Sequence, residues 1–93
     1  MKTEIIKADG TRINIRPENG RDFQLRELQE IVGGYIQIIS LHDGRLMVLN
    51  EEGKLLALPY NNDATEIAQE AEAIFDYDFI AGDVLVCKEG EVR

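Results

Sequence analysis

The sequence predicts a single small α+β domain over residues 1–93, with a mainly antiparallel sheet, the element order ββαβββαβ and two helices packed on one face. Three observations support this fold class. Short apolar runs are separated by an acidic residue followed by Gly, a pair typical of β-hairpin turns. Two other stretches repeat apolar residues at helical spacing. A length of 93 residues supports one modest hydrophobic core rather than two.

A first hairpin is predicted within residues 3–16, TEIIKADGTRINIR, with Asp9-Gly10 as its turn. A two-residue loop at this turn pairs residue i with residue 19 − i, which places Ile6 opposite Ile13. One face of the hairpin is then apolar, and the other carries mainly polar and charged side chains. This pattern is typical of a half-exposed pair of strands.

A first helix is predicted over residues 24–32. Its apolar residues recur at helical spacing, namely Leu25, Leu28, Ile31 and Val32. Gly33 suits the left-handed position that follows a helix end. Two residues are candidates for the N-cap of this helix. Asp22 is a good cap residue, and Gln24 has Glu27 three residues later, which is the capping-box spacing without the usual hydroxyl.

Residues 35–58 are predicted to form a three-strand antiparallel meander, with turns at Asp43-Gly44 and Glu52-Gly53. A two-residue loop at Asp43-Gly44 pairs residue i with residue 87 − i, and both faces then keep apolar pairs, including Leu41 with Leu46. One face should therefore lie under the helices. The other should be covered by the terminal hairpin, by a second copy of the chain or by a ligand, and additional core is the favoured reading because large apolar residues are usually interior.

A second helix is predicted from residue 64 to residue 75, after the loop 60–63. Asp63 with Glu66 fits a capping-box spacing at its start. The apolar positions form the clearest amphipathic pattern in the chain: Ala64, Ile67, Ala68, Ala71, Ile74 and Phe75. A last strand is predicted over residues 84–88, after Gly82-Asp83.

The net charge of −8 lies entirely in the second half of the chain. Residues 1–49 carry seven basic and seven acidic side chains, whereas residues 50–93 carry three basic and eleven acidic ones. Nucleic-acid binding requires cationic groups facing the phosphates, so this half is poorly suited to it. We expect no nucleic-acid partner.

Membrane, metal and disulfide chemistry are also disfavoured. No apolar run approaches the ~20 residues that span a bilayer, and the first ten residues lack the features of a signal peptide. A single cysteine, Cys87, cannot form an internal disulfide, and one His with one Cys cannot make a zinc site without carboxylates or a second chain. We therefore expect a cytoplasmic protein with no membrane partner, no metal and no cofactor.

The loop from Pro59 to Asp63 is the best candidate ligand site. A helix N-terminus offers free N–H groups and a partial positive charge, which suit anions. Tyr60, Asn61 and Asn62 add hydrogen-bonding groups and a stacking surface, and Asn50 belongs to the same candidate set. The alternative interpretation is that Asn and Asp before a helix only cap it.

No catalytic set is predicted. His42 lies beside the Asp43-Gly44 turn, where an exposed position is expected, and the sequence contains no G-x-S-x-G motif. Cys87 falls in an apolar strand and is expected to act as a small buried hydrophobe rather than as a reactive thiol. We expect a protein that is not an enzyme.

Several segments carry a family resemblance: LQEIVGGYIQII, the DG turn, LMVLNEEGKLLALPYN, the AT that opens the second helix, and AGDVLVC. Together they resemble the small proteins of domain-of-unknown-function family 3846, in the expected order and over nearly the whole chain. The resemblance implies a phage, plasmid or gut-bacterial mobile-element protein with no established activity, so no catalytic residue is carried over. The sequence departs from the family at Gln24, where relatives tend to place Ser or Thr, and at Ala57, where Gly is common.

Taken together, these features predict a small acidic accessory protein of a phage or mobile element, with a non-enzymatic role. It would bind a protein partner or assemble with itself as a homo-oligomer. The alternative function is a binder that sequesters a small nucleotide-like ligand at the 60–63 loop.

Overall fold

The centre of the fold is an antiparallel sheet. A computed structural model describes residues 2–92, and within that range the sheet has five strands in the order β2-β1-β5-β4-β3. The strands are β1 (Glu4–Ile6), β2 (Arg12–Asn14), β3 (Ile36–Ser40), β4 (Arg45–Asn50) and β5 (Val84–Lys88). Although β5 is the last strand in the sequence, it lies in the middle of the sheet because it pairs with both β1 and β4. The predicted antiparallel α+β class is confirmed.

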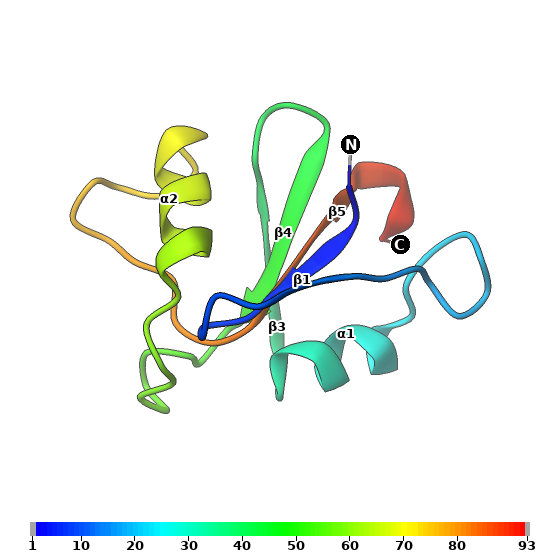
Figure 1. The fold of residues 1–93 in the computed structure, drawn as a ribbon, viewed down its shortest axis with the longest axis horizontal. Helices are drawn as coiled ribbons and strands as arrows, with labels where there is room; N and C mark the ends of the chain where they lie inside the picture. The colour runs from blue at the N-terminus through cyan, green and yellow to red at the C-terminus, as the bar shows by residue number, and fades with distance from the viewer. Residues whose placement is uncertain (1, 93) are drawn as a thin grey trace.

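The two α-helices of the described chain, α1 (Leu25–Val32) and α2 (Asn62–Glu70), lie on opposite faces of the sheet, as Figure 1 shows. Leu28 of α1 belongs to one core cluster together with Val48, whereas Ala68 of α2 belongs to another together with Met47. Adjacent strand residues point to opposite faces, so Met47 and Val48 meet different helices. The prediction that both helices pack on one face was wrong.

The physical reason is that the two central strands are apolar on both faces. Residues 47–50 of β4 and residues 84–87 of β5 are all buried. A sheet centre of this kind needs a cover on each side. Of the predicted meander, β4 is therefore covered on both faces as expected, whereas Ile38 of β3 stays 41% exposed. The second cover of β4 is a helix rather than the terminal hairpin, another copy or a ligand.

Both hairpins have three-residue loops, and their registers differ from the predicted ones by one residue. In β3 and β4, residue i pairs with residue 86 − i, so Ile38 lies opposite Val48. The loop consists of residues 42–44, and Gly44 has a φ of 89°. Asp-Gly located the turn correctly, but Gly is the third loop residue rather than the second. This shift moves Leu46 and Val48 to the face opposite Leu41.

The first hairpin has the same three-residue loop. Ile5 lies opposite Ile13, so residue i pairs with residue 18 − i, and Ile6 does not face Ile13. The N–H of Gly10 donates to the carbonyl oxygen of Lys7 at 3.0 Å, and Gly10 has a φ of 93°. A turn followed by a left-handed residue is the usual three-residue hairpin connection.

The third strand of the predicted meander does not form. After β4 the chain continues in turns, with the N–H of Leu56 donating to the carbonyl oxygen of Glu52 at 2.8 Å and that of Leu58 donating to Gly53 at 2.9 Å. The free edge of β4 is instead occupied by β5. The observed order is therefore ββαββαβ, and Leu55 is left 81% exposed.

Helix α1 begins one residue later than predicted, with Gln24 as its N-cap, and Gly33 adopts the predicted left-handed conformation at φ 79°. The N–H of Gln24 donates to Glu27 Oε2 at 2.7 Å, and the N–H of Glu18 donates to Glu27 Oε1 at 2.8 Å. These two backbone donors hold the pKa of the buried Glu27 carboxyl below its usual value.

We expect E27Q to lower the free energy of unfolding by about 1 kcal/mol at neutral pH, because it weakens two charge-assisted hydrogen bonds. The pKa of Glu27 is lower in the folded than in the unfolded chain, so its contribution is present above the unfolded pKa and is lost as pH falls through the folded pKa. Urea unfolding should therefore show the difference between the wild type and E27Q shrinking as pH falls from 7 to below the ordinary Glu pKa of about 4.3. A constant difference across that pH range would contradict this role.

Helix α2 is shorter than predicted. It ends at Glu70, with Ala71 as its C-cap, and Glu72 then adopts a left-handed φ of 56°. Phe75, predicted as a core residue of this helix, lies in the following loop and is 70% exposed. The N-cap is Asn61 rather than Asp63.

Candidate functional site

The predicted ligand loop, residues 59–63, is fixed against the segment that precedes β5. The N–H of Asn61 donates to the carbonyl oxygen of Ile80 at 2.8 Å, and Tyr60 forms an antiparallel bridge with Ala81. The loop backbone is therefore held by strand-like pairing on one side and by the start of α2 on the other.

Asn61 has a structural role. Its side chain is fully buried, and Nδ2 donates to the carbonyl oxygens of Ile6 and Gly82, both at 2.9 Å. Oδ1 accepts from the N–H of Ala64 at 3.0 Å and so caps α2. This one amide connects β1, the segment before β5 and the first turn of α2, and both of its donors are used inside the protein.

Asn50, also buried, connects α1 to the turn after β4. Its Nδ2 donates to the carbonyl oxygen of Val32 at 3.1 Å, and its Oδ1 accepts from the N–H of Glu52 at 2.8 Å. A Cβ at Gly34 would lie 3.0 Å from this Nδ2, so Gly34 leaves room for the amide. The side chain of Asn50 serves the fold.

Tyr60 and Asn62 are exposed. The Tyr60 ring lies 5.5 Å from the Phe79 ring, centroid to centroid, at an angle of 36°. Asn62 is the first residue of α2. Of the four predicted site residues, Asn50 and Asn61 are buried and bind other parts of the protein. Only Tyr60 and Asn62 have side chains that a ligand could reach.

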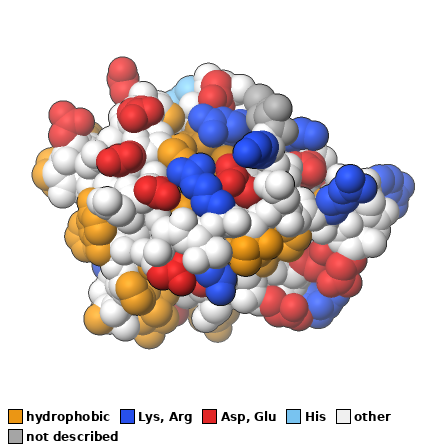
Figure 2. All heavy atoms as spheres, in the orientation of Figure 1, with side chains coloured by type: hydrophobic (Ala, Val, Ile, Leu, Met, Phe, Trp, Pro, Cys, Tyr) orange, Lys and Arg blue, Asp and Glu red, His pale blue; other side chains and the backbone are white. Residues whose placement is uncertain are grey.

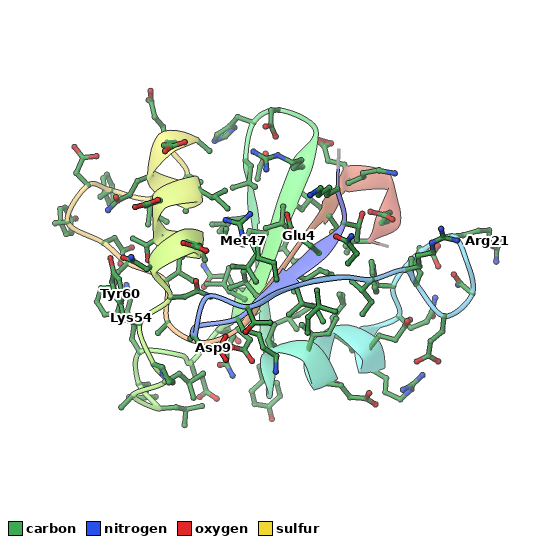
Figure 3. All side chains as sticks on the ribbon, in the orientation of Figure 1. Glu4, Asp9, Arg21, Met47, Lys54 and Tyr60 are labelled. Atoms are coloured by element: carbon green, nitrogen blue, oxygen red, sulfur yellow. The ribbon has the colours of Figure 1, made fainter. Side chains whose placement is uncertain are left out.

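Tyr60 instead belongs to an exposed apolar surface formed by the segment between β4 and α2 and by the loop after α2. We call this the aromatic surface, and it consists of Leu55, Tyr60, Phe75, Tyr77 and Phe79. The exposed fractions of these side chains run from 37% for Phe79 to 83% for Tyr77. Figure 2 shows hydrophobic side chains at the left and lower left of the molecule, where these two segments lie in Figure 1. Figure 3 shows Tyr60 on the same side.

Polar contacts hold this surface in place. Lys54 forms an ion pair with Asp78, and its Nζ lies 4.8 Å from the centroid of the Phe79 ring. Gln69 Nε2 of α2 donates to the carbonyl oxygens of Asp76 and Asp78 at 3.0 and 3.2 Å. The hydrogen bond from Lys54 lowers the pKa of Asp78 from its ordinary value, so the carboxylate is ionised at neutral pH. The loop after α2 is thereby tied both to the helix and to the 54–57 turn.

Two rings of the aromatic surface stack on each other. The Phe75 and Tyr77 centroids are 5.4 Å apart, and the ring planes differ by only 4°. Aromatic pairs gain roughly 0.5–1.5 kcal/mol beyond their buried area. The pair therefore stands out from the loop as one preformed apolar unit.

A cavity of about 320 Å³ opens beside the aromatic surface, on the α2 face of β3 and β4. Its apolar lining includes Ile39, Leu49, Leu55, Ile74 and Phe79. A volume of this size accommodates an apolar side chain of a partner or a small molecule.

The sequence contained one signal for this surface. Residues 75–79 read FDYDF and hold three of the six aromatic residues of the chain, alternating with acidic ones. An alternating acidic and aromatic run is unsuited to the core-facing stripe of a helix. Around Leu55 the signal was weaker: LLAL lacks the β-branched and aromatic residues that favour strands.

The family model described as Domain of unknown function (DUF3846) matches residues 1–92. The chain belongs to the DUF3846 family. This confirms the resemblance drawn from the sequence segments. The match includes both helices, all strands of the described sheet and the aromatic surface. No curated protein and no solved structure matches the chain significantly.

Among the described residues of this DUF3846 protein, no cluster of three or more His, Cys, Asp and Glu side chains is suited to hold a metal ion. Over the same range, no helix has the length and apolar character needed to cross a bilayer.

The two side chains considered for catalysis lie where the sequence predicted them: His42 is exposed and Cys87 is buried. His42 is exposed in the β3–β4 loop with a left-handed φ of 64°. Cys87 is fully buried in β5, and burial raises the pKa of its thiol to about 12. The thiolate, which is the nucleophilic form, is therefore disfavoured at neutral pH in this DUF3846 protein.

Proposed function

We propose that this protein is a non-enzymatic protein-binding module, an accessory protein of a phage or mobile element, and that it binds its partner through the aromatic surface. The observation that supports this is the exposure of five large apolar side chains on two adjacent segments, with Leu55 and Tyr77 each more than four-fifths exposed. Large apolar side chains that are exposed on one side of a soluble protein mark an interaction site.

The character of the surface suits a protein partner. Tyr is enriched at the residues that contribute most to protein interfaces, and Phe is enriched in the buried centre of interfaces. The stacked pair of Phe75 and Tyr77 and the Lys54–Phe79 contact preorganise the rings, which reduces the conformational entropy lost on binding. The adjacent cavity offers a pocket for an apolar anchor side chain of the partner.

Charge indicates the chemistry of that partner. The exposed acidic residues Glu70, Glu72 and Asp76 lie along the end of α2 and the loop that carries Phe75. The whole chain carries a net charge of −8. A partner with an apolar centre and a basic rim is therefore the complementary surface, and long-range attraction would accelerate its association.

The test is a quantitative capture experiment from the native cells with three proteins: the tagged wild type, a double variant F75S/Y77S and a control L25S. Leu25 lies on α1 and is 57% exposed, so L25S removes an exposed apolar side chain away from the aromatic surface. We expect a protein that is recovered with the wild type and L25S and is depleted at least tenfold with F75S/Y77S. That factor corresponds to about 1.4 kcal/mol of binding free energy.

Thermal melts and far-UV circular dichroism establish that all three proteins are folded, as expected for substitutions at exposed positions. If the same proteins are recovered equally with the wild type and with F75S/Y77S, the aromatic surface is not the binding site. If nothing is enriched over the tag alone, the protein-binding proposal fails.

A further inference from the structure

The outer edge of β3 is unpaired. Within residues 2–92, β3 is the terminal strand of the sheet and pairs with β4 alone. The N–H of Glu51 donates to the carbonyl oxygen of Tyr35 at 2.8 Å, and the N–H of Leu41 donates to that of Arg45 at 3.0 Å. Hydrogen-bonded pairs alternate along an antiparallel ladder, so the odd-numbered residues of β3 point their backbone groups at β4.

It follows that the even-numbered residues, Ile36, Ile38 and Ser40, point their N–H and C=O groups away from the sheet. Such a row is a template for another strand. Ile38, at the centre of the row, is also 41% exposed.

The sequence of β3 carries none of the usual protection of an edge strand. IQIIS has no charged residue, no Pro and no Gly. The opposite edge, β2, is only three residues long, and its Arg12 lies 3.6 Å from a Glu4 carboxylate oxygen and 3.4 Å from one of Asp63. Short length and charge are the devices that discourage edge pairing, and β2 has both.

We propose that β3 pairs antiparallel with β3 of a second copy of this chain, about a two-fold axis at Ile38, so that the two sheets join into one. In this arrangement Ile38 faces Ile38 of the second copy, and Ile36 of each copy faces Ser40 of the other. All outward-pointing residues form hydrogen-bonded pairs, each exchanging two N–H···O=C bonds.

We expect the strand that pairs with this edge to come from a second copy of the chain, because the edge of β3 is self-complementary. Its outward residues are placed symmetrically about Ile38, which an isologous two-fold interface requires. No charge lies opposite a like charge along the paired strands, since β3 is uncharged. Ile38 with its counterpart forms a β-branched cross-strand pair, a favourable combination on a sheet face.

The short length of β3 and the net charge of each copy set the strength of association. The paired edge is only five residues long, and the adjacent Tyr35 is 66% exposed. Such an interface buries less area than a permanent dimer needs, so we expect a weak dimer that forms only at higher protein concentration. Two copies of net charge −8 repel each other at long range, and added salt screens that repulsion. The dimer fraction should therefore rise with ionic strength.

The first experiment is size-exclusion chromatography with light scattering across the micromolar to high-micromolar range, on the wild type, I38K and I13K. Ile13 is a matched control because it is an isoleucine on the other edge strand and is 42% exposed, against 41% for Ile38. We expect the wild type and I13K to shift from monomer to dimer with concentration, and I38K to remain monomeric, because two lysines would face each other at the axis.

The second experiment tests the register. The Cα atoms of a hydrogen-bonded antiparallel pair are about 5.5 Å apart, a distance that a disulfide spans. We expect I38C to form a disulfide-linked dimer under mild oxidation. Q37C should not, because Gln37 and its counterpart are diagonal neighbours across the strand pair, about 7–8 Å apart, which is beyond the reach of a disulfide. The native Cys87 is fully buried and does not compete.

A wild type that is monomeric at every concentration would overturn the proposal, and so would a folded I38K that still dimerises. Loss of the dimer in I13K alone would place the interface on β2. Cross-linking of Q37C in preference to I38C would overturn the register. The inference is independent of the proposed aromatic binding surface: a strictly monomeric protein leaves the capture result intact, and a failed capture leaves the dimer intact.

Discussion

The variant N61A is expected to lose about 3 kcal/mol or more of unfolding free energy, the largest effect of any single polar substitution considered for this protein. Removing the amide leaves the carbonyl oxygens of Ile6 and Gly82 without their donor and the N–H of Ala64 without its acceptor. Each buried polar group left without a partner costs about 1–3 kcal/mol, and loss of a helix cap costs about 1 kcal/mol.

Urea unfolding measures this effect, and two further variants separate its causes. N61D keeps an acceptor for the helix cap but places a carboxylate against two carbonyl oxygens, so it should be at least as destabilising as N61A. N62A changes the neighbouring asparagine, which is exposed, and should stay within about 0.5 kcal/mol of the wild type. If N61A and N62A both change the unfolding free energy by less than about 0.5 kcal/mol, Asn61 does not hold β1, the segment before β5 and α2 together.

The second large effect is expected for L85A, which should cost about 2–5 kcal/mol of unfolding free energy. Leu85 is fully buried in the central strand β5 and packs in the same core cluster as Leu28 of α1. Deleting its methyl-bearing carbons removes apolar burial and leaves a cavity that the rigid sheet centre cannot fill.

The control for L85A is L55A, the same chemical change at a residue that is 81% exposed. We expect L55A to change stability by less than about 0.5 kcal/mol in the same urea titration. A meander with a third strand over residues 55–58 would reverse this order, because Leu55 would then pack in the sheet and the role of β5 would be smaller. Equal losses for the two variants would contradict the fold described.

The sequence predicted the local features of the fold well. Both Asp-Gly pairs mark hairpin turns, Gly33 ends α1 and the amphipathic pattern around Ala64 and Ala68 marks α2. These features depend on neighbouring residues alone. Which strand lies beside β4 depends on competition between two apolar segments distant in sequence. LLAL follows β4 directly, yet VLVC, whose β-branched valines favour strands, occupies the position.

The candidate site was less predictable for the same reason. Asn61 and Asn50 looked like ligand-facing amides, but the carbonyl groups that they bind belong to segments far away in the chain. Phe75 fits a helical stripe by spacing, and only the end of α2 at Glu70 places it in an exposed loop. Tyr60, predicted as a ligand-site residue, is exposed, and its ring neighbour is Phe79 rather than the other predicted residues.

Residue-resolved amide hydrogen exchange in dilute solution tests the strand order β2-β1-β5-β4-β3 most directly. That order both excludes Leu55 from the sheet, which creates part of the aromatic surface, and leaves β3 at the edge. We expect slow exchange for the amides of residues 84–87 and for Gln37 and Ile39, and fast exchange for Ile38 and Leu55. Slow exchange at Leu55 together with fast exchange across residues 84–87 would contradict the account.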